Sequence, residues 1–295
     1  MDAIGTAARA IAAGEIDLAI AGGVESMSRA PWVLPKSDTP LDPKLSLQQT
    51  TVGWRMINPN MPSEWTRSLG ESAEKVGERY GISRSAQDEW AVRSHQLADA
   101  AWKNNVNDYV FEVNGISKDE SIRPDSSIEK LSTLPSAFSK TGSVTAGNSS
   151  PLNDGAVATL ITSEKKATDL GLEPIGYILS SAVAALAPDE FTVAPVPAIK
   201  KALAKAGKSF SDVAIFEINE AFAAMVLSVL HELPEIDQNK VNPNGGAIAI
   251  GHPIGASGSR IIADLARALK ARGGGIGVAA ACIGVGQGIA MVIEV

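Results

Sequence analysis

The sequence contains very little cysteine and histidine: its 295 residues include one cysteine, Cys282, and three histidines. A single cysteine excludes an internal disulfide and is typical of a reducing compartment, so we expect a cytoplasmic protein. No group of cysteines and histidines has the spacing of a zinc site, and we expect no metal. Basic residues are outnumbered by acidic ones, 26 to 33, which gives a net charge of −7 and argues against a nucleic-acid partner.

Charge is also absent from one long segment, residues 273–293, which is long enough to span a membrane as a helix. Seven of its residues are glycine, and three of them stand at positions 284, 286 and 288. Two buried strands joined by a glycine turn explain this pattern better, because buried strands read as continuous apolar runs. We therefore expect no membrane span, and no signal peptide either.

The rest of the chain alternates between strand and helix patterns, which predicts an α/β fold with a largely parallel sheet. Residues 28–150 differ, with several prolines and tryptophans before two helical segments, and are typical of a large insertion on a compact core. Ser83 marks the start of the second of these helices. The predicted helices are 2–13, 68–81, 83–104, 163–171, 197–207, 220–233 and 257–272, and the predicted strands are 16–23, 155–163, 175–186, 212–218, one strand just before His252, and two after residue 275.

A weak internal repeat also runs through the chain. A helix, a strand, a glycine turn and a later strand occur once near the beginning and again from residue 257 onward. This predicts two similar halves, residues 1–171 and 172–295. The second half has a long stretch before its repeated helix and the first half has almost none, so we expect that the chain lacks an initial segment.

The most informative motifs lie in the last fifty residues. His252 lies in VNPNGGAIAIGHPIGASGSR, and Cys282 lies in VAAACIGVGQG. Each stands in a glycine-rich turn, where backbone can approach a ligand closely. A thiol and an imidazole on two such turns point to acyl transfer or carbon–carbon bond chemistry. GVGQG has the wrong spacing for a dinucleotide fingerprint, and GASGS fails the pattern of a hydrolase nucleophile elbow.

Together with AGGVESMSRAP (21–31), SVTAGNSSPLNDGA (143–156) and NEAFA (219–223), these blocks resemble the thiolase family of acyl-CoA C-acyltransferases. The resemblance extends over the whole chain. It implies a layered sandwich of two similar α/β halves with mixed sheets and helices, and a loop domain, about residues 28–150, that covers coenzyme A. Coenzyme A would be a substrate and no cofactor is implied. Family members form dimers or tetramers, so we expect a homodimer or homotetramer of the complete protein.

The resemblance also implies catalytic roles. Cys282 matches the cysteine that moves a proton as acid and base, and His252 matches the histidine that activates the nucleophile and donates to the thioester oxygen. Asn219 matches the residue that holds a water in that oxyanion hole, and the Gly284 N–H matches a donor of a second hole. The family's nucleophilic cysteine would fall four residues before Met1. We therefore expect the chain as given to be inactive in thiolysis.

Further positions match the coenzyme A site. Ser150 and Ala146 correspond to contacts with the pantetheine arm, and Arg123 and Phe138 to positions near the nucleotide end and the arm. Three apolar residues are expected at the acyl end, namely Leu69, Phe191 and Phe222. Short-chain biosynthetic members carry His-Met where this chain has Ser68-Leu69, whereas TTVGWRMINPNM (50–61) is similar to members that degrade 3-oxoadipyl-CoA.

Simpler interpretations stand beside these assignments. Without the surrounding motifs, Cys282 would be interpreted as an inert buried thiol, His252 as a structural histidine, and Asn219 as a helix cap. His95 and His231 are expected on helix surfaces with no role. Two alternative functions remain open: a non-catalytic acyl-CoA-binding remnant of the fold, and a biosynthetic thiolase that forms acetoacetyl-CoA.

Overall fold

The computed structural model describes residues 1–37, 39–41, 43 and 46–295, so the predicted insertion 28–150 includes four positions outside the described residues. Its main sheet has four strands in the order β5-β8-β7-β6. Only β6 and β7 run parallel, because helices connect them, whereas β7 and β8 form a tight antiparallel hairpin and β5 pairs antiparallel with β8. The expectation of a largely parallel sheet is therefore wrong. The strands are β5 (Tyr177–Ala185), β6 (Val213–Ile218), β7 (Ile276–Ile283) and β8 (Gln287–Glu294).

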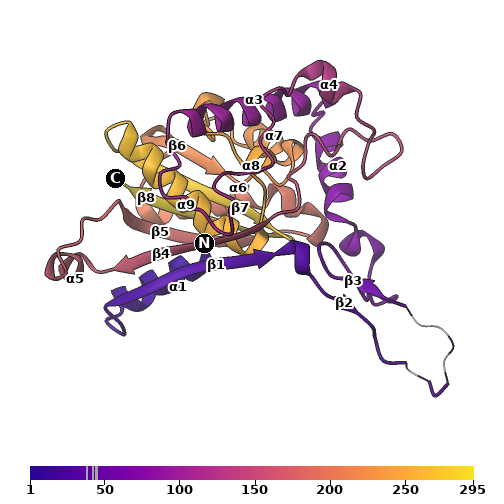
Figure 1. Ribbon diagram of the computed structural model, residues 1–295, viewed down its shortest axis with the longest axis horizontal. Helices are drawn as coiled ribbons and strands as arrows, with labels where there is room; N and C mark the ends of the chain where they lie inside the picture. The colour runs from indigo at the N-terminus through magenta and orange to yellow at the C-terminus, as the bar shows by residue number, and fades with distance from the viewer. Residues whose placement is uncertain (38, 42, 44–45) are drawn as a thin grey trace.

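A second sheet consists of β1 (Leu18–Ser26) paired antiparallel with β4 (Asp154–Thr162). Helices α1 (Asp2–Ala12) and α9 (Ile254–Ala271) contact both sheets. Arg9 on α1 donates to Ser181 on β5 at 3.4 Å, and α9 lies between β1 and the main sheet in Figure 1. Apolar side chains from α1, α9 and both sheets form one continuous buried cluster. The helices thus bury apolar surface on two sides, which explains the small residues along the first turns of α9.

The outer face of the four-stranded sheet is covered by α6 (Pro195–Ala206) and α7 (Ala223–Glu232). Pro195 at the first helical position and Gly207 in the left-handed conformation after the end fix the limits of α6. The larger hydrophobic cluster lies on this side and continues into the segment that joins β1 to β4. The molecule is therefore layered, with helices on both faces of the main sheet.

Residues 27–153 connect β1 to β4 and run over the top and right of the molecule in Figure 1. Helix α2 begins after Ser68, whose hydroxyl accepts from the Glu71 N–H while Glu71 accepts from the Ser68 N–H, a capping box. Helix α3 begins after Ser83, as predicted from the sequence. The elements of this connection are β2 (Trp32–Val33), β3 (Gln48–Gln49), α2 (Leu69–Arg79), α3 (Arg84–Lys103) and α4 (Ile128–Ser132).

Two further helices, α5 and α8, are short, and α8 replaces a predicted strand. The apolar run before His252 forms α8 (Ala247–Ile250), one turn of helix rather than the predicted strand. A run of four apolar residues between glycines fits either structure, and periodicity does not separate them. Helix α5 (Glu164–Asp169) ends as expected, with Gly171 in the left-handed conformation.

The topology contains a helix against an antiparallel strand pair twice. In each half a helix lies against an antiparallel strand pair, α1 on β1–β4 and α9 on β7–β8. The uncharged run 273–293 forms the strands β7 and β8, as predicted. Within the part of the chain that is described, no helix is both long and apolar enough to cross a membrane.

Candidate active site

His252 lies in the turn between α8 and α9. Gly251 has φ 91°, and a β-carbon at that residue would lie 2.3 Å from Asn153 Oδ1, so only glycine fits there. The ring is held on both sides: Nδ1 lies 2.7 Å from Ser257 Oγ, and Nε2 lies 3.2 Å from Asn219 Nδ2. The turn thus fixes the direction of the imidazole.

The hydrogen bonds around His252 also assign its proton. The Ser257 hydroxyl donates to the Pro253 carbonyl at 2.9 Å, so it accepts from the Nδ1–H of the imidazole. Nε2 is then unprotonated and accepts from the Asn219 amide. Burial, with a smaller contribution from the charge of Arg260, lowers the pKa of His252 to about 4. At neutral pH the ring is therefore uncharged and Nε2 carries no proton.

Asn219 directly follows β6 and is almost completely buried. Its backbone N–H donates to the Ala280 carbonyl on β7 at 2.9 Å, which ties it to the neighbouring strand. Within the described residues, its side-chain Oδ1 has no hydrogen-bond partner. A buried amide oxygen of this kind is suited to accept from a water or a ligand.

Cys282 lies near the end of β7, and its S–H donates to Met225 Sδ at 3.7 Å. Burial raises the pKa of the Cys282 thiol to about 12, against a smaller lowering by a backbone hydrogen bond. In the absence of substrate, Cys282 is a protonated thiol and a potential proton donor.

One cavity of about 490 Å³ brings these groups together with most of the predicted substrate residues. Both His252 and Cys282 line it, and Asn219 lies behind His252 at hydrogen-bond distance. Phe138 and Phe222 contact each other edge to face in its wall. The other predicted residues that line this cavity are Gly284, Ser150, Leu69 and Phe191.

Arg123 and Ala146 lie elsewhere, in a neighbouring cavity of about 310 Å³ that shares Ser149 and Pro151 with the first. His95 also lines this second cavity and is buried, so its expected surface position is wrong. Its Nδ1 accepts from the Arg123 N–H at 3.2 Å, and burial lowers its pKa to about 4. His231 is exposed, as predicted.

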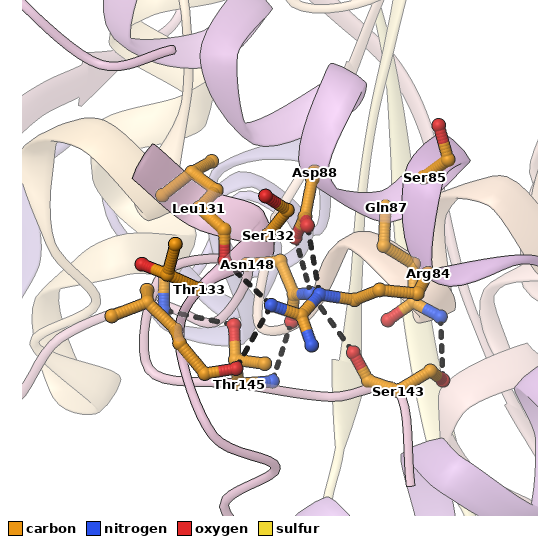
Figure 2. Close-up of polar contacts among 12 residues, drawn as sticks. Arg84, Ser85, Gln87, Asp88, Leu131, Ser132, Thr133, Ser143, Thr145 and Asn148 are labelled. Atoms are coloured by element: carbon orange, nitrogen blue, oxygen red, sulfur yellow. Dashed lines mark hydrogen bonds and ion pairs between the residues drawn. The ribbon is translucent and has the colours of Figure 1, made fainter. Parts of the chain in front are cut away.

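A buried polar network holds the segment between the two cavities (Figure 2). Asn148 donates to Asp88 Oδ1 and to the Ser143 carbonyl, both at 3.0 Å, and accepts from the Thr145 N–H at 2.8 Å. Asp88 in turn pairs with Arg84 at 2.7 Å. The same segment pairs with NEAFA, where the Ser150 N–H donates to the Ala221 carbonyl at 3.1 Å. These contacts bring residues distant in sequence to one cavity.

Three residues of the site were not predicted from the sequence: Ser257, Arg260 and Glu220. Arg260 donates from Nη1 to the Gly251 carbonyl at 2.9 Å and so holds the His252 turn. Glu220 is buried and accepts from Trp90, Ser94, Asn242 and Ile248. A charged residue inside an apolar run is a signal for such a role, whereas nothing in the sequence marks Ser257. The described residues contain no cluster of His, Cys, Asp and Glu that could hold a metal ion.

Comparisons with known proteins identify a family for the whole chain. The Thiolase, N-terminal domain family matches residues 1–165, and the Thiolase, C-terminal domain family matches residues 172–295. The chain is 44% identical over 305 residues to the beta-ketoadipyl-CoA thiolase of Pseudomonas putida, with 100% of this chain and 76% of the relative covered. Its identity to the 3-oxoadipyl-CoA/3-oxo-5,6-dehydrosuberyl-CoA thiolase of Escherichia coli K12 is also 44%, over 307 residues with the same coverage.

Solved structures are similar as well. Human mitochondrial 3-ketoacyl-CoA thiolase in complex with CoA superimposes with a TM-score of 0.93 at 37% identity, covering 99% of this chain and 74% of the human one. The acetyl-CoA acetyltransferase of Bacillus anthracis gives a TM-score of 0.90 at 40% identity, covering 100% of this chain and 76% of the other.

Proposed function

Because this chain belongs to the thiolase family and is therefore an acyltransferase, we propose that its reaction is thiolysis of a 3-ketoacyl-CoA, with 3-oxoadipyl-CoA as substrate. Coenzyme A and the 3-ketoacyl-CoA would give acetyl-CoA and a shortened acyl-CoA. The observation that carries the proposal is the single cavity lined by His252, Cys282 and apolar side chains. The substrate follows from the named activities of relatives at 44% identity.

The cleavage step places two demands on the site. A sulfur nucleophile bonds to C3 of the substrate, the C2–C3 bond breaks, and its electron pair goes to C2, giving the enolate of acetyl-CoA. The enolate oxygen needs hydrogen-bond donors, and C2 needs a proton. We assign the donors to His252 and to a water held by Asn219, and the proton to the Cys282 thiol.

His252 is suited to a double role. Neutral, with Nε2 unprotonated, it takes the proton of an attacking thiol. The same Nε2–H then donates to the thioester oxygen as negative charge develops there. Burial supports this assignment because it favours the neutral ring before the reaction.

We propose the cleavage direction rather than the biosynthetic alternative. Cleavage needs a protonated thiol that delivers its proton to the enolate. The raised pKa of Cys282 keeps that proton on the thiol before the reaction. Ser68-Leu69, in place of the His-Met of short-chain biosynthetic members, points the same way.

We also propose how coenzyme A lies in the site. Its pantetheine arm would follow Ser150 and Ala146 from the first cavity to the second, where Arg123 would meet the nucleotide end. Gly284 would donate its N–H to the acyl carbonyl, while Leu69, Phe191 and Phe222 would surround the acyl chain. Assembly as a homodimer or homotetramer and a cytoplasmic location complete the proposal.

Thiolysis includes a covalent step in which a cysteine sulfur carries the acyl group. Cys282 is the only cysteine of this chain and is assigned to proton transfer, so no second sulfur remains to carry the acyl group. We propose that the 295-residue chain binds acyl-CoA and does not turn it over. The retained contacts among His252, Asn219 and Ser257 argue against a non-catalytic remnant, since binding alone does not require them.

The test is calorimetric titration with coenzyme A, followed by a thiolysis assay with 3-oxoadipyl-CoA and coenzyme A. We expect the 295-residue chain to bind coenzyme A without turnover. Absence of coenzyme A binding would contradict the proposed function. Thiolysis by this chain, with Cys282 unlabelled by substrate, would contradict the expectation that turnover needs a second cysteine.

A further inference from the structure

Among the described residues, no Lys or Arg lines the substrate cavity. Its wall is mainly apolar, Asp2 lines it, and burial lowers the pKa of the amino group of Met1, which also lines it. A substrate such as 3-oxoadipyl-CoA ends in a carboxylate, which is strongly disfavoured in apolar surroundings without a cation. Selection of such a substrate therefore requires a cation next to the cavity.

Arg55 lies next to this wall. Val52 and Gly53 line the cavity, and the Arg55 side chain folds back onto the same loop. Its guanidinium donates from Nη1 to the Gly53 carbonyl at 2.5 Å and from Nη2 to the Thr50 carbonyl. The charged group is thus held against Gly53, which forms part of the cavity wall, within a segment that leads from β3 to α2.

Two features make Arg55 available to an anion. A guanidinium carries five N–H groups, and the two carbonyl bonds leave others for a ligand. The side chain is half-buried, yet no carboxylate of the described residues forms an ion pair with it. A half-buried, unpaired guanidinium at the edge of a ligand cavity is suited to bind a carboxylate through two parallel hydrogen bonds.

Two cations of α2 are already paired. Lys75 pairs with Asp189, and Arg79 pairs with Glu190. Arg67, just before this helix, is exposed and forms no ion pair with a described residue. Arg55 differs from all three because it is both half-buried and unpaired among the described residues.

We propose that Arg55 binds the terminal carboxylate of the acyl chain and so selects 3-oxoacyl-CoA thioesters of dicarboxylic acids. This inference depends on the proposed function, because it assumes that the acyl chain occupies the cavity. Arg55 would determine specificity and would take no part in bond breaking. Neutral acyl chains of the same length would leave its charge unpaired.

The test compares two ligands that lack the 3-oxo group and so bind without cleavage, adipyl-CoA and hexanoyl-CoA. They have the same number of carbons and differ in the terminal carboxylate. Calorimetry on the 295-residue chain should show tighter binding of adipyl-CoA. In R55M, its dissociation constant should rise about 10- to 100-fold, as for loss of a charge-assisted hydrogen bond, while hexanoyl-CoA and coenzyme A change less than about twofold.

Control variants separate recognition from structure. R67M should keep the preference for adipyl-CoA, and R55K should keep only part of it, because an ammonium lacks the planar fork. Equal weakening of both ligands in R55M would assign Arg55 a purely structural role in its loop and overturn the inference. Equal binding of both ligands by the wild type would overturn it too, with coenzyme A binding intact. Failure of the wild type to bind coenzyme A would instead disprove the proposed function, and this inference with it.

Discussion

Ser257 decides which nitrogen of His252 carries the proton. Its hydroxyl is already donated to Pro253, so it accepts from Nδ1–H and leaves Nε2 as the base. We expect S257A to lose this preference and to give a mixture of both neutral tautomers, because the ring then keeps only the Asn219 contact. Nitrogen-15 NMR of the imidazole measures the tautomer directly. S259A is the matched control, since Ser259 lies on the same helix and is equally buried; an unchanged spectrum in S257A would refute the assignment.

Cys282 offers a second test at a single residue. With a pKa of about 12, its thiolate fraction near neutral pH is very small. We expect alkylation by iodoacetamide to be about a thousandfold slower than for a free thiol and to accelerate as pH rises toward 12. Mass spectrometry gives the rate without ambiguity, because the chain has one cysteine. A rate close to that of glutathione at neutral pH would show that the thiol is not buried as described.

At the scale of elements, the contact between β1 and α9 determines where the His252 turn lies. A β-carbon at Gly23 would lie 1.9 Å from the Gly255 carbonyl oxygen, so the strand and the helix touch through backbone alone. We expect G23A to push α9 away and to lower the free energy of unfolding by about 2 kcal/mol or more. Urea denaturation measures this.

Gly77 in the last turn of α2 provides the control for that substitution. A β-carbon there would meet the Ala224 β-carbon at 3.5 Å, an ordinary contact. G77A should therefore be neutral or stabilising by about 0.5 to 1 kcal/mol, from helix propensity alone. If G23A were as mild as G77A, the close packing of β1 on α9 would not be what fixes the turn.

At the scale of the whole molecule, histidines with lowered pKa values make stability depend on pH. His95 and His252 both have pKa values of about 4 in the folded state, whereas an unfolded histidine titrates near 6.5. Between these values the unfolded chain binds more protons. The stability from each neutral ring is therefore fully present above about pH 6.5 and is lost as pH falls toward 4.

H95N isolates one of these histidines, because an asparagine Oδ1 replaces Nδ1 as acceptor for the Arg123 N–H and does not titrate. Between pH 6.5 and 4.5, we expect its stability to fall less steeply than that of the wild type, by up to about 1.4 kcal/mol per pH unit. Denaturation curves at several pH values give the comparison. Parallel pH profiles for the two proteins would mean that His95 becomes protonated without unfolding.

Much of the fold was predictable because its elements carry local signals. The Ser83 hydroxyl caps α3 through a contact within one turn, which the local sequence indicates. The apolar run 273–293 is interrupted by glycines and therefore fits a hairpin of buried strands better than a membrane helix. The wrong predictions concern features for which the local sequence does not distinguish between two structures. The run before His252 suits a strand or a helical turn equally, and strand direction depends on the length of each connection, which periodicity does not report.

The sequence by itself determined the chemistry available: one thiol, an imidazole in a glycine turn, and the motifs that carry the resemblance to thiolases. Only the tertiary structure decided the states of those groups. Burial, which depends on surrounding elements, keeps Cys282 protonated and His252 neutral, and Ser257 selects the tautomer. The tertiary structure also buries His95, although its position on a helix did not indicate this. It places Arg55 beside the cavity without an acidic partner among the described residues. Protonation and pairing depend on neighbours distant in the chain, and these are settled only when the layers pack.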